Sequence, residues 1–205
     1  MPSAPIPFSR TDPAPSDPAL LRAVAAGDLG ALGALYDRYA RDVWRVVARV
    51  LNGSGDVDDV VHATFLKLPE LARSFDGRPS CRNWLCGVAV RLALRRGRTV
   101  ERFTRMLSRF ARAQWVQPSA DPETQTILGE DLAALRRALE SLPPKKRAVV
   151  VLVELQGIPQ EEVAEMLGIP AATVRTRLFS ARKALRDAME SRPPEEVARA
   201  ENAGK

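Results

Sequence analysis

Basic and hydrogen-bonding side chains recur at helical spacing toward the end of the chain. Arg175 and Phe179 are four residues apart, and Thr176, Arg182 and Lys183 fall on the same face of a helix. Arginine can bond the paired acceptors of guanine, threonine can bond a base edge, and further basic groups can hold phosphates. A solvated helical face would have a similar composition, so the interpretation depends on the motif that carries this face.

That motif is predicted in the segment Gln160–Leu178. A helix-turn-helix needs a small residue where its two helices cross, which Ala164 supplies, and a turn residue that tolerates positive φ, which Gly168 supplies. Val174 lies four residues before Leu178, so both can bury the second helix against the first. We therefore predict a helix-turn-helix whose second helix enters the major groove of DNA.

The composition indicates an all-α protein with a local concentration of basic charge. Apolar residues make up 45% of the 205 residues, too many for a disordered chain, and long alternating β-branched runs are missing. The net charge is +6, while residues 91–112 alone hold eight arginines and one glutamate. We expect this segment to be a basic amphipathic helix with four apolar residues on its other face: Phe103, Met106, Leu107 and Phe110.

Helical periodicity and proline-rich stretches divide the chain into two small helical domains. Asp28 is a predicted N-cap, and the apolar residues that follow it, Tyr36 among them, recur at three- and four-residue steps. Pro144 suits the first turn of a later helix. The predicted organisation is a disordered leader (1–18), a first domain (19–98), a basic flexible linker (99–130), a second domain (131–189) and a disordered tail (190–205).

The residues of the chain offer little for catalysis, metal binding or membrane insertion. Cys81, Cys86 and the single histidine, His62, do not have the spacing of a zinc site or a disulfide framework. No nucleophile–base pair or phosphate-binding loop is visible, so we expect neither an enzyme nor a cofactor. No apolar run approaches the length of a membrane span, and no signal peptide is recognised. We expect a cytoplasmic protein.

The C-terminal motifs resemble a known DNA-binding domain. The runs Leu142–Gly157, Glu161–Pro170 and Thr173–Leu185 are similar to the promoter-recognition sigma-4 domain of bacterial sigma-70 family factors. Within this family the likeness is to the small extracytoplasmic function (ECF) group.

The N-terminal motifs resemble the sigma-2 domain of the same family. Ala25–Asp28 with Leu35–Tyr39 is similar to its opening helix, and Asp56–Leu68 to its helix that binds core polymerase. Arg82–Leu85 with Val88–Ala89 is similar to its promoter-melting segment.

The resemblance implies a sigma factor that binds core RNA polymerase and directs initiation at specific promoters of a stress or envelope regulon. It would be a monomer when free, with promoter DNA as a further partner and an anti-sigma factor as a candidate partner. The implied contacts with the minus-thirty-five element are Arg175, Thr176, Arg177, Phe179, Ser180, Arg182 and Lys183. Those with the minus-ten element are Arg78, Ser80, Asn83, Trp84 and Arg91, and those with core polymerase are Asp56, Asp58, Asp59, His62 and Phe65.

The chain departs from the family pattern in its first domain. His62-Ala63 stands where relatives usually carry glutamine and an acid, and Cys86-Gly87 replaces an aromatic–basic pair. Arg91 and Arg95 replace a common asparagine and aspartate, which implies an altered minus-ten preference. Two other interpretations stay open: a helix-turn-helix regulator that acts without core polymerase, and a sigma-like interaction protein.

Overall fold

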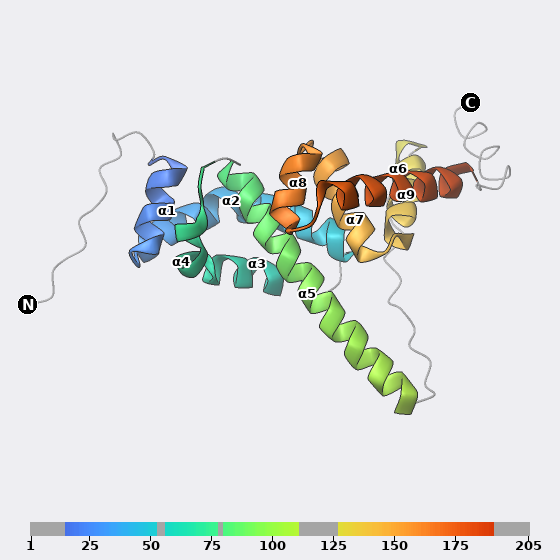
Figure 1. Cartoon of the computed structure of the whole chain (residues 1–205), viewed down its shortest axis with the longest axis horizontal. Coiled ribbons are helices and arrows are strands. Elements are labelled where there is room, and N and C mark those ends of the chain that lie inside the picture. The colour runs from blue at the N-terminus through green and yellow to red at the C-terminus, as the bar shows by residue number, and fades with distance from the viewer. Residues whose placement is uncertain (1–14, 53–55, 78–79, 111–126, 191–205) are drawn as a thin grey trace, which may run out of the picture.

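The computed structural model describes residues 15–52, 56–77, 80–110 and 127–190, with the backbone alone described for 97–110 and 127–133. The described residues form helices and turns without a strand, which confirms the predicted all-α fold with two helical domains (Figure 1). The N-terminal half contains α1 (Asp17–Ala25), α2 (Leu29–Leu51), α3 (Val57–Leu66), α4 (Leu68–Leu71), the 3-10 turn η1 (Ala72–Ser74) and α5 (Cys81–Phe110). The C-terminal half contains α6 (Ile127–Ser141), α7 (Pro144–Val150), the π-helical turn η2 (Val151–Leu155), α8 (Gln160–Leu167) and α9 (Ala171–Glu190).

The helix α2 begins and ends where its sequence provides caps. The carboxylate of Asp28 accepts hydrogen bonds from the backbone N–H of Gly30 at 2.7 Å and of Ala31 at 3.1 Å, which confirms the predicted N-cap. Asn52 ends the helix in the left-handed conformation, with φ of 58°, which asparagine tolerates better than most residues. Between the caps, one apolar stripe faces the core: Ala31, Leu35, Val43, Val46, Val47 and Val50.

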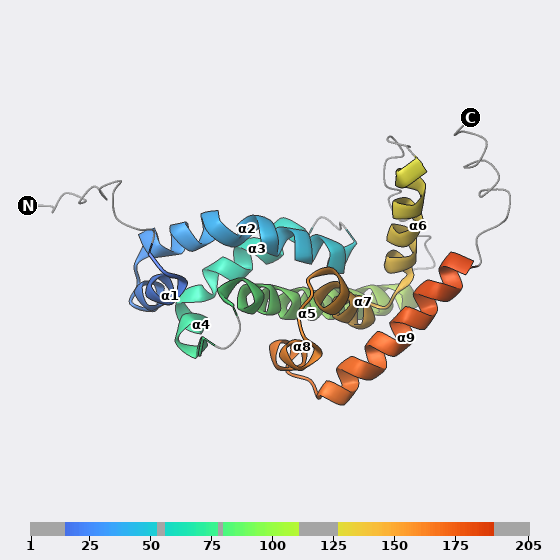
Figure 2. The same ribbon diagram turned by 90° about the horizontal axis from the view of Figure 1, so that it is seen from above.

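The helix α5 packs against α2, α3 and α8, and Figure 2 shows it between α2 and α8. Its second half projects from the body of the molecule (Figure 1). Its fully buried residues are Leu85, Cys86, Ala89, Val90 and Ala93. Burial raises the pKa of Cys81 to about 12 and that of Cys86 to about 11, so both thiols stay protonated at neutral pH. Both are free and buried.

The helix-turn-helix forms at the predicted residues. Gly168 caps α8 with φ of 63°, and the N–H of Ile169 bonds to the carbonyl of Ala164 at 3.0 Å. Val174 and Leu178 of α9 are buried, as their spacing predicts. The structure therefore confirms α8 and α9 as a helix-turn-helix, with α9 as the second helix.

The two halves pack directly on each other, and Arg147 joins them at one end of α2. Its buried guanidinium donates to the carbonyl of Val50 at 3.1 Å and to that of Leu142 at 2.7 Å. Val50 lies in the last turn of α2, where carbonyls lack a partner within the helix. Burial lowers the pKa of Arg147. The side chain of Asn52 also crosses between the halves, donating to the carbonyl of Glu140 at 3.2 Å.

The backbone of the basic segment is helical. The helix α5 continues to Phe110, as expected from a helix over residues 91–112, and α6 begins at Ile127. Residues 1–14, 111–126 and 191–205 lie outside the described part, as do the side chains of the predicted basic amphipathic segment from residue 97 onward. Among the described residues, no helix has the length and apolar character needed to cross a membrane.

Two aspartates at helix starts allow a test of capping. Asp28 accepts two backbone bonds, whereas Asp56 occupies the N-cap of α3 without a side-chain cap bond. Asp28→Ala should lower the free energy of unfolding by about 1 kcal/mol, and Asp56→Ala should change it by less than about 0.5 kcal/mol. Urea denaturation followed by circular dichroism measures both. Equal losses in the two variants would contradict this account of α2.

Candidate nucleic-acid interface

The outer face of α9 carries the side chains predicted to read DNA. Arg175, Thr176 and Lys183 are exposed, and Phe179 exposes 75% of its surface although it is apolar. Arg177 and Ser180 are half-buried. Because Val174, Leu178 and Ala181 occupy the opposite face, α9 can enter a groove without losing its packing. An exposed phenylalanine between basic groups suits contact with a thymine methyl group or a sugar.

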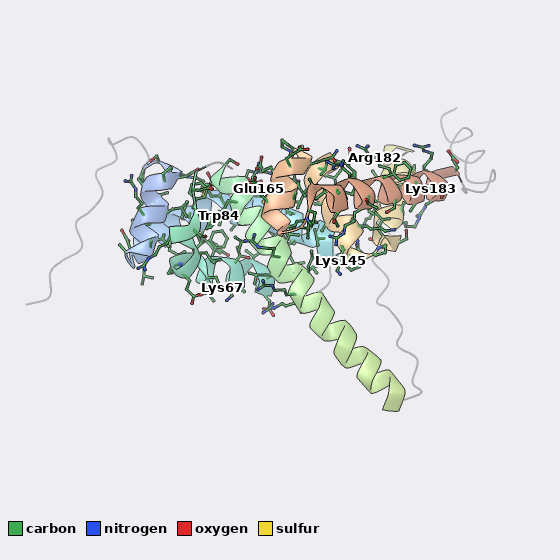
Figure 3. All side chains as sticks on the ribbon, in the orientation of Figure 1. Lys67, Trp84, Lys145, Glu165, Arg182 and Lys183 are labelled. Atoms are coloured by element: carbon green, nitrogen blue, oxygen red, sulfur yellow. The ribbon has the colours of Figure 1, made fainter. Side chains whose placement is uncertain are left out.

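Hydrogen bonds fix part of this face before any ligand binds. The Thr176 hydroxyl donates to the carbonyl of Ala172 at 2.9 Å, so its oxygen remains an acceptor toward an external donor. Arg182 Nε donates to Glu154 of η2 at 2.9 Å. Figure 3 shows Arg182 and Lys183 close together on α9. A phosphate at Arg182 would therefore compete with the Glu154 carboxylate, whereas Lys183 forms no ion pair with another described residue.

The start of α5 holds an aromatic side chain beside polar groups. The hydroxyl of Ser80 accepts a bond from the N–H of Asn83 at 3.2 Å, which caps the helix. Trp84 is half-buried, and its ring meets that of Phe75 edge-on at 5.3 Å between centroids and 65° between planes. Packing against Phe75 covers part of the Trp84 ring, and the rest of the side chain is accessible to solvent. The predicted site residue Arg78 lies outside the described residues.

Three polar residues of α5, each partly exposed, contact the C-terminal half. Arg82 Nη2 donates to Gln156 Oε1 at 2.7 Å, and its Nε donates to Asp42 at 3.1 Å. Asn83 Nδ2 donates to Glu162 at 2.9 Å, and Arg91 Nη1 donates to the backbone carbonyl of residue 166 at 2.6 Å. Burial, followed by the charge of Arg95, lowers the pKa of Arg91. The structure thus places two predicted minus-ten residues, Asn83 and Arg91, at the contact between the halves.

The helix α3 presents the predicted acidic residues on its outer face. Asp58 accepts a bond from Trp44 Nε1 at 2.9 Å, and Asp59 forms an ion pair with Arg96 at 3.6 Å. Exposed pairs of this kind stabilise a fold by about 0–1 kcal/mol, so they can be exchanged for an external partner at little cost. Asp56 is also exposed and forms no side-chain cap bond.

The two remaining predicted residues of α3, His62 and Phe65, differ in how far they are exposed. His62 is exposed, and its ring stacks at 6.3 Å from that of Tyr36. Phe65 exposes only 3% of its surface and meets the Tyr36 ring edge-on at 4.8 Å. Phe65 therefore lies in the core and supports the outer surface through Tyr36 instead of forming part of it. Tyr36, which belongs to the apolar pattern predicted for α2, is partly exposed.

Sequence reasoning missed two apolar residues on this surface. Trp44 exposes 45% of its surface and Leu66 exposes 75%. Trp44 lies off the valine stripe of α2, and Leu66 directly follows the buried Phe65. Helical periodicity therefore could have predicted that both side chains are exposed. Together with Asp58 and His62 they form a mixed apolar and acidic surface, the composition of a protein-binding site.

Metal binding finds no support in the part of the chain that is described. No group of three or more His, Cys, Asp or Glu side chains there is arranged to hold a metal ion. The surfaces described above can recognise nucleic acid and protein through hydrogen bonds, charge and apolar contact.

Comparisons with known proteins agree with both halves. Residues 35–103, which include most of α2 and α5 and all of α3 and α4, match the family model of sigma-70 region 2. Residues 132–185, which cover most of α6 and α9 and all of α7 and α8, match that of sigma-70, region 4. The ECF RNA polymerase sigma-E factor of Escherichia coli (strain K12) is 32% identical over 177 residues, which cover 83% of this chain and 92% of that protein.

Further relatives extend the likeness to solved structures. The ECF RNA polymerase sigma factor SigE of Mycolicibacterium smegmatis is 32% identical over 175 residues, covering 80% of this chain and 64% of that protein. CnrH, solved with the cytosolic domain of CnrY, is 27% identical with a TM-score of 0.55, covering 85% of this chain and 97% of that one. RpoE of Bartonella quintana, solved with the anti-sigma factor NepR, shares the fold at 18% identity with a TM-score of 0.60, covering 78% and 96%. The chain belongs to the sigma-70 family of RNA polymerase sigma factors, in its extracytoplasmic function group.

Proposed function

We propose that three separate surfaces of this sigma factor perform its three contacts: α3 with core RNA polymerase, the start of α5 with the minus-ten element, and α9 with the minus-thirty-five element. As an ECF sigma factor the protein directs promoter-specific initiation of transcription and is not an enzyme. The observation that carries the proposal is the recognition face of α9, which leaves Arg175, Thr176 and Phe179 exposed on an intact helix-turn-helix.

The outer face of α9 supports a division between readers and phosphate holders. Arg175 and Phe179 lie one helical turn apart on the exposed face. In the major groove, an arginine so placed bonds guanine, and the phenylalanine contacts a methyl group or a sugar. Arg177 is half-buried, and Arg182 is shared with Glu154, so both are better suited to hold phosphates from the edge of the groove.

The surface of α3 supports docking on polymerase because it combines acids with exposed apolar groups. Asp58 and Asp59 supply charge, while Trp44 and Leu66 supply apolar area that water covers in the free chain. Exposed apolar side chains next to exchangeable ion pairs are typical of a site that a partner covers.

The start of α5 supports capture of an unstacked base. Ser80 and Asn83 offer hydrogen-bonding groups beside the half-buried ring of Trp84. One N–H of the Asn83 amide donates to Glu162, and its second N–H and its carbonyl oxygen can still bond to a base.

Several finer aspects of the function rest on the relatives. The regulon is proposed to serve stress or envelope responses, and the protein to act in the cytoplasm as a monomer when free. An anti-sigma partner is proposed because RpoE of Bartonella quintana, which shares the fold, was solved with the anti-sigma factor NepR. Run-off transcription by purified core polymerase, with and without the chain, on fragments of its own genome tests the whole proposal. Selective DNA binding without any polymerase-dependent transcription would instead favour a conventional helix-turn-helix regulator.

Charge reversal tests the polymerase surface. Asp58→Lys with Asp59→Lys should weaken binding to core polymerase at least tenfold, because basic side chains would then face the polymerase groups that pair with acids. Glu70→Lys with Glu165→Lys makes the same change in charge at other exposed positions and should bind normally. Co-purification with core at increasing salt measures both pairs. The assignment of α3 fails if the two double variants bind core equally well.

Base capture at α5 predicts separate effects for two residues. Asn83→Ala should relax base preference in the minus-ten element only, because it removes hydrogen-bonding groups. Trp84→Ala should slow promoter opening, and Trp84→Phe should largely restore it because an aromatic ring remains for stacking. Permanganate footprinting and selection of promoter variants measure these effects. Normal opening in Trp84→Ala together with unchanged preference in Asn83→Ala would refute the site.

The recognition helix predicts a contrast between two arginines. Arg175→Ala should cost about 1–3 kcal/mol on the preferred minus-thirty-five element and relax choice at one base pair. Arg182→Ala should weaken binding to all sequences nearly equally, because phosphates are the same at every base pair. Binding-site selection with polymerase holoenzyme measures both. A uniform loss in Arg175→Ala and a changed preference in Arg182→Ala would reverse the two roles.

A further inference from the structure

A row of arginines follows α5 from its middle to its end at helical spacing. Alternating steps of three and four residues separate its five members, which are Arg95, Arg98, Arg102, Arg105 and Arg109. Because a helix turns by about 100° per residue, these steps keep all five within an arc of about 80° on one face. We call this row the arginine stripe.

The backbone of α5 makes this face continuous. The element is one α-helix from Cys81 to Phe110, so no turn interrupts the stripe. With a rise of about 1.5 Å per residue, the stripe is about 21 Å long. Figure 1 shows the second half of α5 projecting from the body, and no other described helix runs alongside its last turns. Most of the stripe therefore lies on the projecting part of the helix.

The other residues of this segment fall on different faces. By the same rotation, the four apolar residues Phe103, Met106, Leu107 and Phe110 share an arc centred about 110° from the centre of the stripe. Thr104 and Ser108 fall on a third face. A solvated charged helix usually carries both signs of charge along one face, whereas every member of this row is positive. The sorting of residue types indicates that the stripe has a ligand of its own.

The charge of the stripe identifies that ligand as a repeating anion. Neighbouring members stand three or four residues apart, and like charges at these spacings destabilise a helix. An anion bound along the row would remove this repulsion. Guanidinium groups bond phosphate oxygens through two parallel N–H groups, so a row of them fits a chain of phosphates.

The position of the stripe favours duplex DNA among polymers of phosphate. The helix α5 begins at the proposed minus-ten site, and Arg95 follows Trp84 by 11 residues, which is about 16 Å along the helix. Over the about 21 Å of the stripe, one strand of duplex DNA presents about six phosphates. Proteins that bind single strands combine basic groups with aromatic platforms, whereas Phe103 and Phe110 fall outside the arc of the stripe.

We propose that the arginine stripe is a further nucleic-acid site, which holds the phosphate backbone of the duplex beside the minus-ten element and reads no base. This site is additional to the three surfaces above, and it rests on the proposed function only for the position of promoter DNA at the start of α5. Because phosphates are the same at every base pair, the stripe adds affinity and salt dependence at all promoters without adding base preference.

Removing charge from the stripe tests the site through its salt dependence. The neutral variant carries Arg102→Gln, Arg105→Gln and Arg109→Gln. The logarithm of the binding constant of polymerase holoenzyme for promoter DNA falls with the logarithm of salt concentration, by about 0.9 for each phosphate held. We expect the neutral variant to lower this slope by about 2.7, and selection of promoter variants should show unchanged base preference. An unchanged slope would overturn the inference.

Two controls separate the stripe from charge in general. The distant control removes the same charge from exposed positions on α2 and η1 through Arg41→Gln, Arg49→Gln and Arg73→Gln, and it should keep the wild-type slope.

The shifted variant keeps the composition but moves two arginines off the stripe. It carries Arg102→Thr with Thr104→Arg, and Arg105→Ser with Ser108→Arg. Its slope should fall by about 1.8, because two phosphate contacts are lost. A shifted variant that behaves like wild-type would show that net charge alone is responsible, and the inference would fail.

A lysine variant guards against an effect on folding. Arg102→Lys, Arg105→Lys and Arg109→Lys keep the row and its charge, so this variant should retain most of the slope. Circular dichroism compares the helix content of all variants. If the lysine variant loses as much slope as the neutral variant while both keep their helices, the row does not act by holding phosphates and the inference is overturned.

An uncharged stretch of DNA backbone locates the contact. Methylphosphonate linkages replace about six phosphates of one strand, starting about five base pairs from the minus-ten element, on its upstream or its downstream side. On one of the two sides, this patch should lower the slope of wild-type holoenzyme but not lower that of the neutral variant further. Equal losses for both proteins with both patches would place the phosphate contacts elsewhere and refute the site.

Binding by the full chain without polymerase separates the inference from the proposed function. If wild-type chain forms no promoter complex with core polymerase, the proposed function fails. The stripe is then tested on random-sequence duplex DNA, where the slope of the wild-type chain should exceed that of the neutral variant by about 2.7. Single-stranded DNA and vesicles of phosphatidylglycerol with phosphatidylcholine serve as alternative ligands. A stripe-dependent loss that is larger on either of them than on duplex DNA would overturn the assignment.

Discussion

The packing of α5 between α2 and α8 is the constraint on which the rest of the structure depends. One face of α5 carries Leu85, Ala89 and Val90 into the N-terminal core, where α2 contributes its valine stripe. The opposite side carries Gly87 and Arg91 to α8. A single helix therefore fixes the interior of one half and the position of the other, and the predicted minus-ten residues lie on the element that does both.

Arginines complete the ends of helices across the boundary between the halves. Arg147 donates to the carbonyl of Val50 at the end of α2, and Arg91 donates to that of Met166 at the end of α8. Free carbonyls at a helix end need a donor when they are buried, and a cation there also interacts favourably with the helix dipole. Arg147 does this at a cost, since its buried Nε has no hydrogen-bond partner among the described residues. Each half thus supplies a hydrogen-bond partner for a helix-end carbonyl of the other half, which would have no partner within its own half.

Local sequence signals predicted the helices and the helix-turn-helix well. The cap at Asp28, the start of α7 at Pro144 and the turn at Gly168 each depend on one residue and its neighbours, which a sequence displays directly. Contacts between distant helices were not predictable in this way. Apolar periodicity shows which face of α5 is buried but not that α8 covers Gly87. It also groups Tyr36 with the apolar stripe of α2, although that side chain is partly exposed.

The order of synthesis gives the contact between α5 and α8 a further consequence. The chain grows at about 5–20 residues per second, and Arg91 precedes its acceptor Met166 by 75 residues. The N-terminal half therefore leaves the ribosome about 4–15 seconds before α8 can reach it. During this interval the Gly87 side of α5 is bare in every newly made molecule. Each nascent chain therefore exists once with this side of α5 uncovered. The finished protein reaches that form only when its two halves separate.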